Sequence, residues 1–131
     1  MSELVFRAAY QNQHEEVKVN LILLSFKDDN NVVFVYSPHL DLSGYGTTLA
    51  EAKKSFEIVF GDFIEYTLNK KTLAKILTQL GWKLKGTVKK PSKVIAPSIA
   101  TIIKDNKYVA EIFDNYPVKT FHQEVRLPIV A

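Results

Sequence analysis

The stretch Val33–Phe63 constrains the fold of this chain more than any other part of its sequence. It begins as an apolar strand that runs into Ser37-Pro38, crosses a Gly44-Tyr45-Gly46 turn and enters a helix at Thr48. The entry is a capping box, because this threonine is followed three residues later by Glu51. We expect Thr48 to accept a hydrogen bond from the Glu51 amide, and Glu51 to reach back to the Thr48 amide. The stretch therefore predicts a strand, a turn and a helix in direct succession.

Two strands loaded with apolar residues on both faces precede the helix. Val17–Phe26 and Val32–Ser37 are predicted strands, joined by the turn-forming residues Asp28–Asn31. An antiparallel hairpin with one wet face alternates apolar and polar residues, and this one does not. We expect one face to be covered by the helix. The other face is covered either by a second subunit, which makes the protein a homo-oligomer, or by the segment Ile99–Phe113 folding back.

An apolar stripe marks the first predicted helix, Thr48–Leu68, and a second helix is predicted over Thr72–Leu80, ending at Gly81. The stripe consists of residues at three- and four-residue spacings: Leu49, Ala52, Phe56, Val59, Phe60 and Phe63. Phenylalanines at this spacing indicate core packing against the sheet.

The C-terminal part of the chain reads as strands. The predicted elements are a strand from Trp82 to Val88, a loop bracketed by Pro91 and Pro97, a hairpin of Ile99–Lys104 and Lys107–Phe113 turning at Asp105-Asn106, and a last strand Thr120–Leu127. The predicted fold class is α+β: an antiparallel sheet packed by one long helix plus a second short helix, with additional C-terminal β-strands. We expect a single domain over residues 1–131, with a β-rich extension over about residues 83–131.

Composition narrows the class of protein. The chain of 131 residues is 47% hydrophobic and contains no cysteine, which excludes a disulfide framework, a thiolate metal site and a cysteine nucleophile. The first residues lack a positive start followed by an apolar core, so we expect no signal peptide. The longest apolar runs are too short to cross a membrane. These patterns predict a soluble, cytoplasmic protein.

Side chains that carry catalysis are sparse. His14, His39 and His122 lie in three separate segments, and no H-x-x-x-H or carboxylate spacing typical of a metal site occurs. The Gly44-Tyr45-Gly46 stretch lacks the third glycine of a dinucleotide loop and the lysine of a P-loop. No nucleophile, base and orienting group can be assembled. We therefore expect no catalytic residues, no cofactor, no metal and no enzymatic activity.

Positive charge gathers late in the chain. The net charge is +3, but residues 1–82 carry −2 and residues 83–131 carry +5. A run without acidic neighbours contains Lys85, Lys89, Lys90 and Lys93. Such a run attracts phosphates, and these four lysines are the candidate nucleic-acid-binding residues. Lysines along a strand also serve as a solvated face or as a guard against edge-to-edge aggregation.

The order of strand, proline loop, glycine turn and capped helix resembles the HicB family, the antitoxins of HicA messenger-RNA-cleaving toxins. The residues that carry the resemblance are Pro38, Leu40, Gly46, Thr48, Glu51 and Ala52. The resemblance implies a partial ribonuclease-H-like fold, in which a three-stranded sheet is followed by a helix and a further strand, without a working catalytic site. It also implies binding to a small basic toxin, and frequent oligomerisation.

One part of the HicB pattern is missing. Family members that repress their own operon usually carry a C-terminal ribbon-helix-helix or helix-turn-helix. Here Lys119–Ala131 begins like the strand of a ribbon and has no helix after it. We therefore expect a non-catalytic protein-binding module, as an antitoxin that neutralises a HicA-type toxin. The alternative is a nucleic-acid-binding module that uses the lysine-rich strand.

Overall fold

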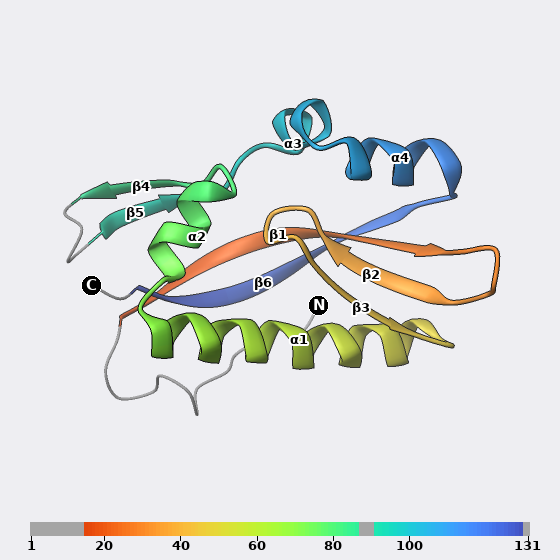
Figure 1. The fold of residues 1–131 in the computed structure, drawn as a ribbon, viewed down its shortest axis with the longest axis horizontal. Helices are drawn as coiled ribbons and strands as arrows, with labels where there is room; N and C mark the ends of the chain where they lie inside the picture. The colour runs from red at the N-terminus through yellow and green to blue at the C-terminus, as the bar shows by residue number, and fades with distance from the viewer. Residues whose placement is uncertain (1–14, 87–90, 130–131) are drawn as a thin grey trace.

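The computed structural model describes residues 15–86 and 91–129. Strands β1, β2, β3 and β6 form an antiparallel sheet in the order β3-β2-β1-β6, and β4 pairs with β5 in a separate ribbon (Figure 1). The mixed α+β class is confirmed. The elements are β1 (Glu15–Lys27), β2 (Val33–Ser37), β3 (Leu42–Gly46), α1 (Leu49–Lys70), α2 (Leu73–Gln79), β4 (Lys83–Gly86), β5 (Pro91–Ile95), α3 (Ile99–Asp105), α4 (Lys107–Asn115) and β6 (Lys119–Ile129).

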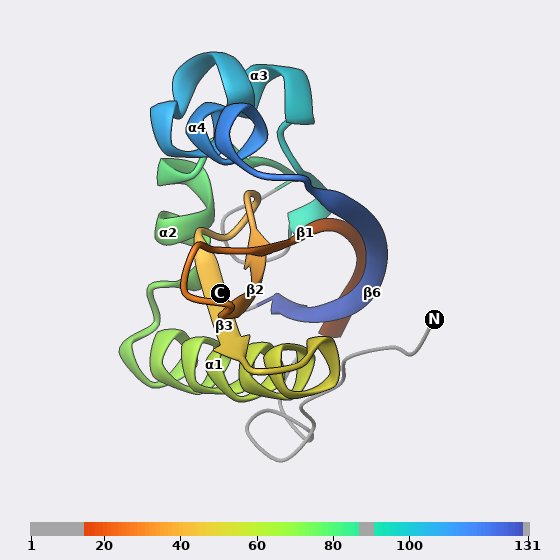
Figure 2. The same ribbon diagram turned by 90° about the vertical axis from the view of Figure 1, so that its right-hand side faces the viewer.

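Strand β1 changes character halfway along its length. Lys18 and Asn20 in its first half are exposed, so this half has one polar and one apolar face. In the second half both faces are apolar: Leu21 and Leu23 join one core cluster, and Leu24 joins another. The sheet is therefore sandwiched only where β1 meets β2. Figure 2 shows α1 on one side of the curved sheet, with α3 and α4 on the other.

Helix α1 covers the first face through the predicted phenylalanine stripe. Phe56 and Phe60 are 1% and 0% exposed, and their rings stack at 6.4 Å. The buried positions continue to Ile64, whereas Leu49, which we expected in the stripe, is 41% exposed. The apolar face of the helix thus packs in one cluster with residues of β1, β2, β3 and β6, and burial of each such ring stabilises the fold by about 1.5–3 kcal/mol.

The helix entry matches the predicted capping box in one of its two bonds. Thr48 accepts from the Glu51 amide at 3.1 Å. The Glu51 carboxylate reaches one residue further back than expected, to the amide of Thr47 at 3.0 Å and its hydroxyl at 2.7 Å. These hydrogen bonds lower the pKa of Glu51, since they favour its charged form.

The Gly44-Tyr45-Gly46 turn was a wrong prediction, because these residues form most of strand β3. The chain turns earlier, over residues 38–41, where Asp41 adopts a φ of 54° and its amide donates to the Ser37 carbonyl at 2.8 Å. The glycines allow close contact instead. A Cβ at Gly44 would lie 2.2 Å from the backbone nitrogen of Phe56 in α1.

The predicted hairpin over residues 99–113 is also wrong: this segment forms the two helices α3 and α4. The Asp105-Asn106 pair does not make a hairpin turn, because the Asn106 side chain caps α4 by accepting from the Tyr108 and Val109 amides. Short apolar runs fit either a strand or a buried helix, and here the three-residue spacing of Val109 and Ile112 decides for a helix. The predicted β-rich extension from about residue 83 thus contains two helices as well as strands.

Helices α3 and α4 cover the second face of the sheet. Ile102, Val109 and Ile112 pack in one cluster with Leu24 and Phe26 of β1. The chain therefore supplies its own cover for the face that suggested a second subunit. The segment does fold back as one of the two alternatives expected, but it does so as helices.

The remaining C-terminal strands bracket these helices. β6 pairs with β1 along its whole length, and contains the predicted last strand. Residues 91–95, expected in a loop, form β5 and pair with β4, with an irregularity between Lys85 and Gly86. Pro91 is tolerated there because it is the first residue of the strand.

Among residues 15–86 and 91–129, no helix has the length and apolar character needed to cross a membrane.

The close contact at Gly44 makes a specific prediction. Its φ is not positive, so alanine fits the backbone, but the new methyl group would collide with the α1 backbone. We expect Gly44→Ala to lower the free energy of unfolding by about 1–3 kcal/mol or more in urea titrations. Ser43→Ala, at the exposed neighbouring position, should change it by less than about 0.5 kcal/mol. Equal stability of the two variants would contradict the packing of β3 on α1.

Candidate functional site

The predicted lysine site falls on the β4–β5 ribbon. Lys85 lies on β4 and is the register partner of Lys93 on β5, so two of the four candidate lysines are neighbours. Lys89 and Lys90 lie outside the described residues. Lys83, also on β4, is exposed. The ribbon stands apart from the four-stranded sheet (Figure 1), so the described part of the lysine-rich run lies on a small separate element.

His39 is a structural residue in the turn before β3. It is only 4% exposed, its Nε2 lies 2.9 Å from the Pro97 carbonyl, and its Nδ1 accepts from the Ile22 amide at 3.5 Å. The indole of Trp82 donates to the His39 carbonyl at 2.8 Å. These bonds tie β1, the turn and the chain before α3 to one another. Burial lowers the pKa of the imidazole, and the bond to Pro97 opposes this in part.

A cleft of about 260 Å³ opens beside this histidine, between the 38–41 turn, the end of α2 and the start of α3. Two polar side chains that line it, those of Asp41 and Asn106, already have hydrogen-bond partners within the fold. The Tyr36 hydroxyl donates to Asp41 at 2.7 Å, and Asn106 caps α4. Burial, reinforced by the Asp41 carboxylate, raises the pKa of Tyr36, so its hydroxyl stays a donor. The geometry supports a structural role for these side chains.

Within the part of the chain that the structure describes, no three His, Asp or Glu side chains gather as a set that could hold a metal ion.

The outer face of α1 is a surface that our sequence reasoning missed. Ile58 and Tyr66 are 58% and 61% exposed, although both are large and apolar. Asp62 lies one helical turn from each of them, and Glu65 lies two turns after Ile58. We call Ile58, Asp62, Glu65 and Tyr66 the acidic α1 face. The signal was available in the sequence, since Ile58 and Tyr66 fall outside the phenylalanine stripe.

The carboxylates lie in the middle of α1, and a lysine lies one helical turn beyond each exposed apolar residue: Lys54 before Ile58 and Lys70 after Tyr66. Residues 55–69 contain three carboxylates, from Glu57, Asp62 and Glu65, and neither lysine nor arginine. The lysines of the helix lie towards its ends, and Lys53 sits 4.7 Å over the Phe121 ring of β6. The middle of α1 therefore presents two exposed apolar side chains with Asp62 and Glu65 between them in the sequence.

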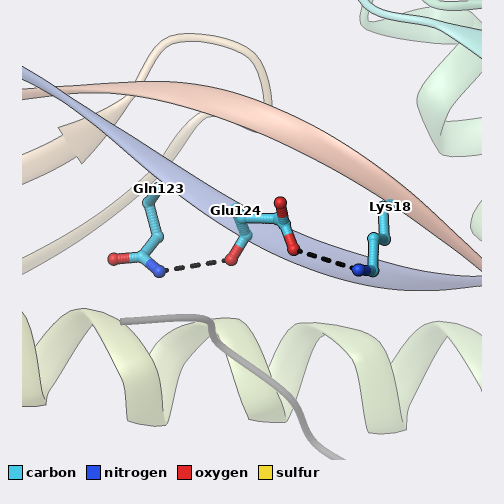
Figure 3. A network of polar contacts seen from close by, with 3 residues as sticks. All are labelled: Lys18, Gln123 and Glu124. Carbon is cyan, nitrogen blue, oxygen red and sulfur yellow. Dashed lines mark hydrogen bonds and ion pairs between the residues drawn. The ribbon is translucent and has the colours of Figure 1, made fainter. Parts of the chain in front are cut away.

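The opposite side of the β1–β6 ribbon is polar in its first half. Lys18 of β1 forms an exposed ion pair with Glu124 of β6 at 3.6 Å (Figure 3). Next to it, the Gln123 side chain donates to the Glu124 carbonyl at 3.2 Å. An exposed pair of this kind contributes little to stability.

Comparisons of the chain with protein families, with curated proteins and with solved structures found no match.

The buried His39 predicts a pH dependence of stability. The unfolded chain binds a proton on this imidazole near pH 6.5, and the folded protein binds it less readily. Acid therefore favours the unfolded chain: stability is lost as pH falls below about 6.5, until the folded pKa is passed. The denaturation midpoint in urea should fall between about pH 7.5 and about pH 5.

Two variants isolate the contribution of this histidine. In His39→Gln the urea denaturation midpoint should fall less with acidification than in the wild type. In His122→Gln, which is changed at an exposed position, it should fall as much as in the wild type. The account is wrong if the two variants show the same pH dependence.

Proposed function

We propose that this protein is a non-catalytic, HicB-like protein-binding module that binds a small basic protein through the acidic α1 face. The partner we propose is a HicA-type toxin, which the bound module would neutralise in the cytoplasm. The observation that carries the proposal is the exposed pair Ile58 and Tyr66, with the carboxylates of Asp62 and Glu65 between them in the sequence.

The residues behind the HicB resemblance support the proposal at the level of the scaffold. Gly46 lets the chain pass α1 closely, since a Cβ there would lie 2.5 Å from the Glu51 Cβ. Thr48 caps the helix, Ala52 is fully buried, and Leu40 packs in the same core cluster. These four motif residues thus help to build the junction between the sheet and α1. That junction orients the outer face of the helix.

Charge complementarity supports the choice of partner. Two exposed apolar side chains supply contact area, while the carboxylates around them attract a basic surface and repel an acidic one. A HicA-type toxin, which the family resemblance implies, is small and basic. A partner of this chemistry fits the acidic α1 face better than the lysine-bearing β4–β5 ribbon.

Self-association stays a prediction that rests on the family resemblance. The apolar face that also suggested it is covered by α3 and α4. Light scattering tests it directly: a mass near the 14.9 kDa of one chain would mean a monomer.

The second candidate function is nucleic-acid binding by the lysine-rich ribbon. The observation in its favour is the register pairing of Lys85 with Lys93, which places positive charge on adjacent strands. Phosphate contacts of this kind give steeply salt-dependent affinity without sequence preference.

We expect the double variant Asp62→Lys/Glu65→Lys to bind a purified HicA-type toxin at least about tenfold more weakly in calorimetric titration. The reason is that the variant reverses the charge of the acidic α1 face. The loss should shrink at high salt, which screens exposed charges. A matched control is Glu111→Lys/Asp114→Lys on α4, where both residues are exposed, share the same spacing and undergo the same charge change. An equal loss in both variants would mean that net charge, and not this face, governs binding.

The nucleic-acid alternative has its own test. Replacing Lys85, Lys89, Lys90 and Lys93 together by alanine should leave the protein folded, since exposed charges usually contribute no more than about 0.5 kcal/mol each to stability. If the ribbon is the working surface, the wild type binds polynucleotides tightly with a steep salt dependence, and the quadruple variant does not. That result would displace the protein-binding proposal.

A further inference from the structure

The outer side of α1 carries a short ridge with a cation, an apolar residue and an anion in succession. Its residues are Lys54, Ile58 and Asp62, one helical turn apart, and we call them the Ile58 ridge. Ile58 lies two residues before the buried Phe60, which is about 200° around the helix, so it points almost directly away from the core. All three ridge residues are exposed, and α1 is the outermost described layer on its side of the sheet (Figure 2).

The two charges of the Ile58 ridge are not paired with each other. Lys54 and Asp62 lie eight residues apart, which is about 12 Å along a helix and too far for an ion pair. Neither of them forms an ion pair with another residue that the structure describes. A binding partner that satisfies both charges must therefore supply an acidic group at one end of the ridge and a basic group at the other.

A second copy of the ridge, running in the opposite direction, supplies these groups. With a two-fold axis at Ile58, Lys54 of one copy meets Asp62 of the other, and the symmetry makes the same contact twice. The two Ile58 side chains, each 58% exposed in the single chain, meet between the charged pairs and lose contact with water. The ridge is therefore complementary to itself in charge and in apolar surface.

The usual geometry of helix packing suits this contact. Ridges of residues at four-residue spacing align most often when two helices cross at about −50°. A crossing at this angle keeps the contact short and centred on Ile58. Glu51 and Glu65 lie two turns from Ile58 on either side, where the crossing helices have diverged, so their like charges do not face each other across the interface.

We propose that the protein forms a homodimer in which two α1 helices cross in opposite directions at the Ile58 ridge. Charge favours a second copy at this position, because a basic partner would meet Lys54 as well as Asp62. A single helix crossing buries less than the roughly 1,200 Å² of a stable interface, so we expect a Kd of about 10–1,000 µM. The dimer covers Ile58 and Asp62 of the acidic α1 face, so it competes with the basic partner. Only this competition rests on the proposed function; the dimer does not.

Charge reversal tests the dimer in the full chain, by sedimentation equilibrium at concentrations up to about 1 mM. The mass of the wild type should rise with concentration from the 14.9 kDa of one chain towards twice that value. Lys54→Asp places two carboxylates at each contact, and Asp62→Lys places two lysines there. Each variant should therefore dimerise at least about tenfold more weakly than the wild type.

Two rescue experiments separate the contact from a general effect of the substitutions. An equal mixture of Lys54→Asp and Asp62→Lys restores opposite charges at both contacts, so it should form a heterodimer about as tightly as the wild type dimerises. The double variant Lys54→Asp/Asp62→Lys exchanges the charges within one chain and should dimerise again. The matched control Lys107→Asp, at an exposed position of α4, should dimerise like the wild type.

The outcomes separate this inference from the proposed function. A wild type that stays monomeric at about 1 mM overturns the dimer, and so does a dimer that survives either charge reversal, or a pair of variants that do not rescue each other. None of these results concerns toxin binding. The competition has its own measurement: Lys54→Asp, as a monomer with a more acidic face, should bind the HicA-type toxin at least as tightly as the wild type. Weaker binding would contradict the competition and leave the dimer in place.

Discussion

The fold depends on the second half of β1, where apolar side chains leave both faces of one strand. Leu21 and Leu23 need cover on one side, while Leu24 and Phe26 need it on the other. A single helix can bury one face only. Helix α1 covers the first face, and helices α3 and α4 cover the second (Figure 1). This arrangement explains why the C-terminal segment returns to the sheet, and why β6 can close its edge against β1.

The sequence predicted the parts of this arrangement that local patterns determine. The stripe through Phe56 and Phe60 and the cap at Thr48 have strong periodic or positional signals, and both are present in the structure. The two-faced loading of β1 correctly indicated cover on both sides. The apolar pattern of β1 did not determine what covers the second face of the sheet, because a second subunit and a folded-back segment bury the same surface.

The wrong predictions share a physical cause, which is that tertiary contacts decided between local alternatives. Glycine is common in turns, but Gly44 and Gly46 lie in a strand. No side chain fits at either position, because α1 lies directly against this strand. Asp105-Asn106 could make a hairpin turn, but Asn106 caps a helix instead. The candidate site has a weaker sequence signal, because Ile58 and Tyr66 lie outside the buried stripe of α1 and two isolated residues make no periodic pattern.

The central claim, that the chain covers both faces of its own sheet, is tested most directly by one double-mutant cycle. The Phe26 ring of β1 stacks on the Tyr116 ring at the end of α4, with ring centroids 5.1 Å apart. Unfolding free energies of Phe26→Leu, Tyr116→Leu and the double variant give their coupling. We predict a coupling of about 0.5–1.5 kcal/mol at a protein concentration where the chain is monomeric. Additivity within about 0.3 kcal/mol would show that α4 does not lie on this face.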